Sequence, residues 1–65
     1  MPDKQLFETA VTDAMVVLEL LKQDVFTGPA YTTADASTEK AKAAGWTFEQ
    51  IEAEAQRRID SDATK

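Results

Sequence analysis

The sequence contains neither cysteine nor histidine. Without cysteine the chain forms no disulfide, and it lacks the thiolate ligands of most structural zinc sites. Without histidine it lacks the commonest metal ligand and the commonest general base. A chain of 65 residues is close to the lower limit for folding alone, and such chains usually depend on disulfides, a metal or association. We therefore expect either unusually good packing or a fold completed by a second chain.

Long apolar runs are also missing. The longest run is five residues, 14–18, whereas a membrane-spanning helix needs about 20. The opening residues Met-Pro-Asp-Lys lack the basic and then apolar order of a signal peptide. We expect a cytoplasmic protein that does not enter the membrane.

Basic side chains are scarce relative to acidic ones. Seven Lys and Arg face 12 Asp and Glu, which gives a net charge of −5. Such a surface repels nucleic-acid phosphates and anionic lipid headgroups, and it suits a basic protein partner. The hydrophobic share of 43% is too high for a disordered chain.

What the sequence does contain is apolar side chains at helical spacing. It predicts one all-α domain over residues 1–65, with three helices at about 4–26, 37–44 and 48–60. Residues 27–36 are expected to form a connecting loop, and residues 61–65 are expected to fray.

The first helix has recognisable start and stop signals. Asp3 is a suitable N-cap, because its carboxylate can accept from the unpaired amides of the first turn. Gly28 followed by Pro29 is typical of a helix end, since glycine adopts the left-handed conformation and proline does not continue a helix.

The expected loop carries one aromatic side chain, Tyr31, which we interpret either as a partner contact or as a cover over the core. Gly45 is expected to close the second helix. Three residues can each cap that helix at its start: Thr33, Asp35 and Ser37.

The connection to the third helix has the clearest local pattern. Thr47 and Gln50 fit a capping box, in which each side chain accepts from the other's backbone N–H. Trp46 before the cap and Ile51 in the first turn fit a hydrophobic staple. This pattern predicts a helix that begins directly after Thr47.

Large apolar side chains are concentrated in the first helix. Five lie in residues 27–65: Tyr31, Trp46, Phe48, Ile51 and Ile59. Eleven lie in residues 1–26 besides Met1: Leu6, Phe7, Val11, Met15, Val16, Val17, Leu18, Leu20, Leu21, Val25 and Phe26. Leaving Val16 and Leu20 in water forfeits roughly 1.5–3 kcal/mol each relative to burial. We therefore predict a homodimer along the first helix, with Met15, Val16 and Leu20 in the interface.

No pattern in the sequence indicates catalysis, a metal or a cofactor. Glu49 and Glu52 lie one helical turn apart, but no basic or aromatic neighbour is positioned to shift a pKa, so we interpret them as a solvated face. Together with Tyr31 they are candidate contacts for a partner. Asp60 and Asp62 are interpreted as an acidic tail rather than a cation site. The chain offers no nucleophile beside a base and no glycine-rich phosphate loop, so an enzyme is not expected.

The region around Gly45 resembles a helix-turn-helix unit in three positions: Ala41, Gly45 and Ile51. This resemblance implies a DNA-binding regulator, with residues 48–60 as the recognition helix. Lys40 and Glu54 depart from the pattern at positions that are usually apolar, and acids in the candidate recognition helix oppose phosphate contacts.

The leading hypothesis is a non-enzymatic, acidic protein-interaction module that forms a homodimer and binds a partner protein. Three alternatives stay open. One is a phage- or mobile-element-type acidic inhibitor that mimics nucleic acid and blocks a host protein. The others are the helix-turn-helix regulator and an accessory subunit of a larger enzyme.

Overall fold

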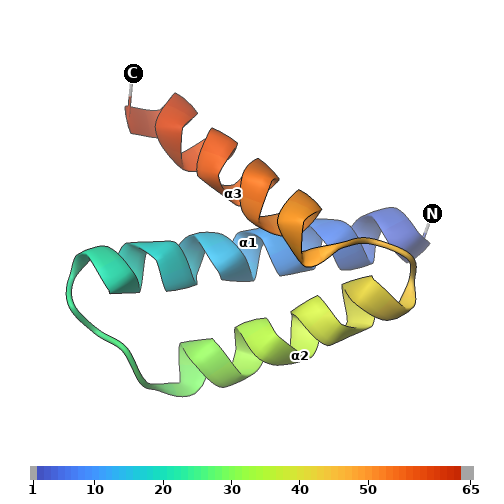
Figure 1. The fold of residues 1–65 in the computed structure, drawn as a ribbon, viewed down its shortest axis with the longest axis horizontal. Coiled ribbons are helices and arrows are strands. Elements are labelled where there is room, and N and C mark those ends of the chain that lie inside the picture. The colour runs from blue at the N-terminus through green and yellow to red at the C-terminus, as the bar shows by residue number, and fades with distance from the viewer. Residues whose placement is uncertain (1, 64–65) are drawn as a thin grey trace.

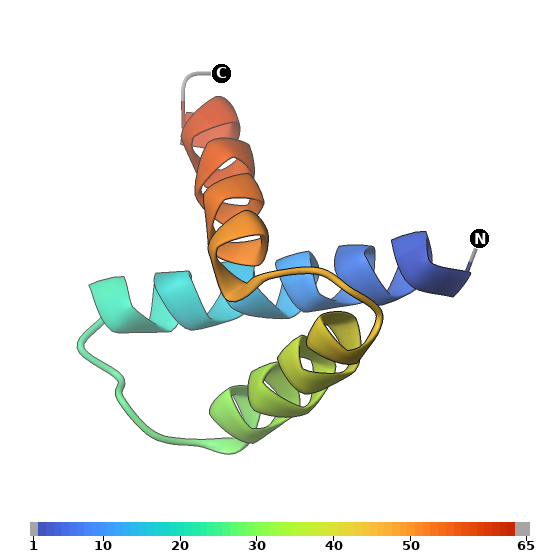
Figure 2. The same cartoon turned by 45° about the vertical axis from the view of Figure 1, so that its right-hand side comes forward.

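Three α-helices form the fold, as the sequence predicts, and no strand occurs in residues 2–63, the part of the chain that the computed structural model describes. α1 spans Pro2–Lys22, α2 spans Pro29–Ala43 and α3 spans Phe48–Ala63. α2 runs back along α1 as an antiparallel hairpin, and α3 crosses α1 (Figure 1). Figure 2 shows α3 leaving the plane of that hairpin. α2 and α3 therefore each pack on α1 but contact each other only weakly.

α1 ends at Lys22, four residues before its predicted end. The Asp24 N–H donates to the Leu21 carbonyl at 3.1 Å, and the Val25 N–H donates to the Leu20 carbonyl at 2.9 Å. These two bonds, with Asp24 at a φ of 61°, form a Schellman motif. The apolar spacing of the following residues had predicted further helical turns. That prediction is wrong because these side chains are exposed and gain no packing from helical continuation.

α2 begins at Pro29, so the predicted loop over residues 27–36 is wrong and the connection is shorter. Gly28 is the N-cap of α2, with a φ of 139° that favours glycine, and Pro29 stands at the first helical position. Proline is favoured there because its missing N–H would have no partner. The Gly-Pro pair thus starts the second helix and does not end the first.

The three predicted caps of α2 are accordingly interior residues. Ser37 is buried with Ala34 and Ala41 on the face that packs against α1. Its hydroxyl donates to the Ala34 carbonyl at 3.1 Å. Small side chains at helical spacing let α2 approach α1 closely, and this packing outweighs the weak helix propensity of the threonines in its first turns.

The corner between α2 and α3 is as predicted. The Trp46 N–H donates to the Ala41 carbonyl and the Gly45 N–H donates to the Lys42 carbonyl, both at 3.0 Å, with Gly45 at a φ of 109°. The capping box is formed in both directions: Thr47 N–H to Gln50 Oε1 at 2.8 Å, and Gln50 N–H to Thr47 Oγ1 at 3.1 Å.

The outer helix ends extend further than predicted. α1 begins at Pro2, so Asp3 lies within the helix and not at its N-cap. α3 continues to Ala63, because no glycine or proline interrupts residues 61–63. The last two residues of the predicted frayed tail, 64 and 65, lie outside the described part.

The core is small and rich in alanine. Its buried cluster consists of Ala10, Val11, Ala41, Ile51 and Ala55. Only two large side chains of the described residues, Val11 and Ile51, are fully buried. The accessible surface of 4549 Å² exceeds the roughly 4,100 Å² typical of a compact monomer of this mass. The three helices therefore leave more surface exposed than a compact monomer of this mass does.

Candidate interaction surface

Exposed apolar side chains gather at the C-terminal half of α1 and in the linker after it. Of the five large hydrophobic residues that are exposed in the described part of the chain, four lie there, and the fifth, Phe48, is at the start of α3. The four are Val16, Leu21, Val25 and Phe26. Because monomeric proteins seldom expose contiguous apolar patches, this end of the molecule is the first candidate for an interface.

The three residues predicted to form the dimer interface differ in their burial. Val16 is 45% exposed, and Leu20 is half-buried. Met15 is also half-buried and packs against the core cluster. Val16 is thus the most exposed of the three by fraction.

An apolar groove opens where all three helices meet. Its volume is about 230 Å³. The lining residues of this apolar groove are Ala14, Val17, Leu18 and Leu21 from α1, Tyr31, Ala34, Asp35 and Thr38 from α2, and Phe48 and Glu52 from α3. The groove exists because α2 and α3 diverge from their corner and leave this stretch of α1 between them (Figure 2).

Tyr31 lines this groove from the first turn of α2, not from a loop as expected. Its hydroxyl donates to the Val25 carbonyl at 2.5 Å. The bond ties the linker to α2, while the half-buried ring forms part of the groove wall. A partner contact by Tyr31 therefore stays a prediction.

Two acids stand at the apolar groove, Asp35 on α2 and Glu52 on α3. Within residues 2–63 neither carboxylate forms an ion pair. The structure thus brings together two of the three predicted partner contacts, Tyr31 and Glu52. The third, Glu49, is exposed and does not line the groove.

Sequence reasoning missed Asp35 and Phe48 as members of this surface. Phe48 was counted only among the large apolar side chains of residues 27–65, and the structure leaves it 53% exposed. Its position directly after the Thr47 cap was the available signal, since a first-turn side chain lies at the end of the packed face.

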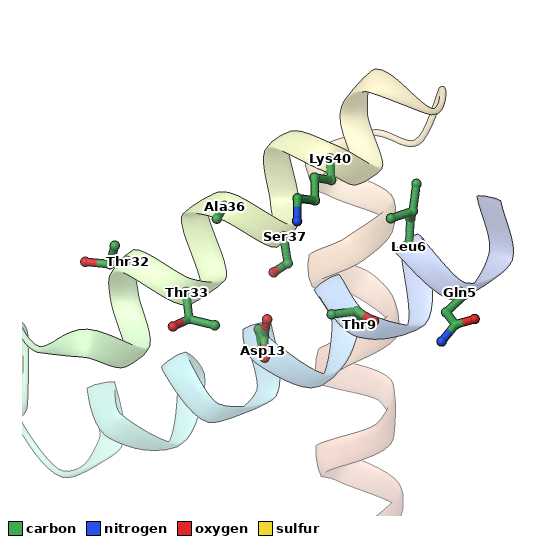
Figure 3. Close-up of a pocket in the computed structure, with 9 residues that line it drawn as sticks. All are labelled: Gln5, Leu6, Thr9, Asp13, Thr32, Thr33, Ala36, Ser37 and Lys40. Atoms are coloured by element: carbon green, nitrogen blue, oxygen red, sulfur yellow. The ribbon is translucent and has the colours of Figure 1, made fainter. Parts of the chain in front are cut away.

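A second, larger groove runs between α1 and α2, with a volume of about 730 Å³. Most of its lining residues carry a hydroxyl, amide or charged group, although apolar atoms form the larger part of the exposed lining. The residues are Gln5, Leu6, Thr9, Asp13, Thr32, Thr33, Ala36, Ser37 and Lys40. Asp13 of α1 and Ser37 of α2 point into the space between the two helices (Figure 3). The Ser37 hydroxyl is already engaged with a backbone carbonyl.

An ion-pair cluster joins α3 to α1. Arg58 Nη1 lies 2.8 Å from Glu8 Oε2, and Arg58 Nε donates to Glu54 Oε2 at 2.7 Å. Arg57 also pairs with Glu54. These hydrogen bonds lower the pKa of Glu54 to about 2, and the bond from Arg58 lowers the pKa of Glu8 below its usual value. Both arginines of the candidate recognition helix are therefore engaged by carboxylates of the same chain.

Two further features, a carboxylate cluster for a metal ion and a membrane-spanning helix, are absent from residues 2–63. Among residues 2–63 no three carboxylates approach one another closely enough to hold a metal ion. In the same range, no helix combines the length and apolarity needed to cross a membrane. Comparison with protein-family models, with curated proteins and with solved structures gave no match.

Proposed function

We propose that this chain is a non-enzymatic protein-interaction module that forms a homodimer along α1 and acts by binding a partner protein. The observation that carries the proposal is the contrast between core and surface. Among the side chains that the structure describes, two large ones are fully buried, while five large hydrophobic ones are exposed. An interface is the usual reason for such a distribution in a soluble domain.

The dimer surface follows from the faces of α1. Its core-facing side carries Ala10 and Val11, whereas Val16 and Leu20 line neither of the two grooves described above. Burying one such side chain completely stabilises by roughly 1.5–3 kcal/mol. A twofold arrangement doubles every contact, because each residue appears in both copies.

Glutamate substitutions at this face test the dimer. Val16 is exposed in the monomer, so the charge of Val16→Glu loses its hydration only in a dimer, and this variant is expected to give a folded monomer. Leu20 is half-buried, so Leu20→Glu is expected to give a monomer or to unfold the chain. Ala53→Glu, at an exposed position of α3 away from this face, is the matched control and keeps the dimer. The measurements are mass by light scattering and helicity by circular dichroism. A monomeric wild-type chain with native helicity contradicts the dimer.

A DNA-binding regulator is the alternative that the α2–α3 corner favours. Ala41 and Ile51 are fully buried there and Gly45 has a positive φ, which agrees with the helix-turn-helix resemblance. Against it, the arginines at the end of α3 are paired with Glu8 and Glu54. A gel shift at low salt tests this alternative: it requires a retarded complex that added salt dissociates.

An acidic inhibitor of a nucleic-acid-binding protein is a specific form of the interaction module. It is supported by the net charge of −5 and by the engagement of the arginines within the chain. It requires a complex with a basic protein that weakens as salt rises.

A further inference from the structure

We propose that the apolar groove binds an amphipathic helix of a partner protein that carries Lys or Arg beside its apolar stripe. This inference rests on the proposed function as an interaction module, and it specifies the binding site and the chemistry of the partner. Helices bind such grooves by inserting apolar side chains spaced three or four residues apart.

The size and lining of the groove favour side chains over a small molecule. Its volume of about 230 Å³ is below the roughly 300–1,000 Å³ of typical small-molecule sites. Its floor is Val17, Leu18 and Leu21 of α1, and its walls include the rings of Tyr31 and Phe48. Aromatic side chains in such a position are common anchors of protein interfaces.

The charges at the groove specify a basic partner. Asp35 and Glu52 stand on the two flanking helices, one on each. Neither has an ion-pair partner among residues 2–63. An apolar helix laid between them would partly desolvate both carboxylates, which is unfavourable unless cations accompany it. Lys or Arg on both edges of the incoming helix supplies those cations.

A second copy of this chain is a poor occupant of the groove. Each copy carries a net charge of −5. Of the six basic side chains in residues 2–63, four already pair with carboxylates: Lys22, Lys42, Arg57 and Arg58. Self-association through Val16 and Leu20 uses residues that do not line the groove, so both interactions are compatible.

The test selects helical peptides from a phage-displayed library of random 16-residue sequences on three forms of the chain. The forms are wild type, the double variant Asp35→Lys/Glu52→Lys, and the control Glu39→Lys/Asp60→Lys. Each variant changes one exposed or half-buried acid on α2 and one on α3, and both shift the net charge by the same amount. Wild type and control are expected to enrich peptides with an apolar pair three or four residues apart and basic flanks. The groove variant is expected to enrich acidic flanks.

Synthetic copies of the peptides enriched on wild type are then measured by fluorescence anisotropy and methyl NMR. We expect about tenfold weaker binding to the groove variant than to the control, because two favourable charge pairs become repulsive. We also expect shifts of the Val17, Leu18 and Leu21 methyl signals. Equal affinity for the two variants, unshifted methyl signals, or the absence of any groove-dependent peptide overturns the proposal.

The same peptides separate this proposal from self-association. Binding that persists in Val16→Glu supports a groove independent of the dimer. If the wild-type chain is monomeric but still binds basic peptides, the dimer proposal is contradicted and the groove proposal stands. If the chain is dimeric but enriches no such peptide, the groove proposal is contradicted and the dimer proposal stands.

Discussion

Arg58 of α3 contacts Glu8 of α1 at 2.8 Å, although fifty residues separate them in the sequence. The same guanidinium donates to Glu54 one turn earlier in α3. It therefore binds two carboxylates at once and links α3 to α1 beside the buried contacts of Ile51 and Ala55. Because the crossing of α3 over α1 also shapes the apolar groove, the ion-pair cluster bears on the proposed binding site as well as on stability.

Replacing Arg58 with methionine is expected to lower the Tm by a few degrees, since the contact between α1 and α3 loses its charged bridge. Arg57→Met is the matched control, because Arg57 is more exposed and pairs only with Glu54 of its own helix. Thermal unfolding followed by circular dichroism measures both. A double-mutant cycle with Glu8→Gln isolates the pair, and a coupling of zero would show that the bridge does not position α3.

Stability is expected to fall in acid. The ordinary pKa of Glu54 is near 4.5 and its pKa in the folded chain is about 2. The unfolded chain therefore binds a proton at a higher pH than the folded chain does. The contribution of Glu54 is complete above about pH 4.5 and is lost as the pH falls from 4.5 to 2, and Glu8 shifts in the same direction.

Urea unfolding at several pH values between 2 and 7 measures this dependence. Glu54→Gln removes the titrating group and is expected to flatten the profile between pH 4.5 and 2. Glu49→Gln, an exposed acid on the same helix, is expected to leave the profile nearly unchanged. Identical profiles for the two variants would contradict the account of the cluster.

Phe7 and Trp46 stack with ring centroids 4.2 Å apart, and both pack against the core cluster. Phe7→Ala is expected to destabilise the fold by roughly 2 kcal/mol, through lost burial and lost stacking. Phe26→Ala is the control: Phe26 is 65% exposed, so its loss is expected to cost about 0.5 kcal/mol or less. Equal effects in urea unfolding would mean that the stack is not part of the core.

Asp24 has a positive φ of 61° at the end of α1. Asp24→Gly is expected to stabilise the chain by about 0.5–1 kcal/mol, because glycine adopts this conformation without steric cost. Asp24→Val is expected to destabilise it, since a β-branched side chain is disfavoured there. The two changes in the free energy of unfolding should have opposite signs; a shared sign would contradict the assigned Schellman motif.

The local features of the fold were largely predictable from the sequence. The corner from Gly45 to Gln50 was predicted because each of its hydrogen bonds joins residues at most five apart. The Gly28-Pro29 pair was misread because the same two residues are typical both of a helix end and of a helix start. Deciding between these roles requires knowing that Ala34 and Ala41 pack on α1, which is a tertiary contact.

The candidate interface was predictable in part. Counting apolar side chains predicted uncovered surface on α1, and the exposure of Val16 and Leu21 agrees with that count. The apolar groove was not predictable. It depends on the angle at which α3 leaves α2, and that angle is set by contacts such as Arg58 with Glu8 that periodicity does not specify.

The most direct test of the central claim is the mass of the wild-type chain by multi-angle light scattering, across a range of concentrations. The proposed module predicts a mass approaching about 14.4 kDa, twice the monomer mass of 7.2 kDa, and a return toward 7.2 kDa in Val16→Glu. A wild-type mass that stays at 7.2 kDa at every concentration, with native helicity, would contradict self-association along α1.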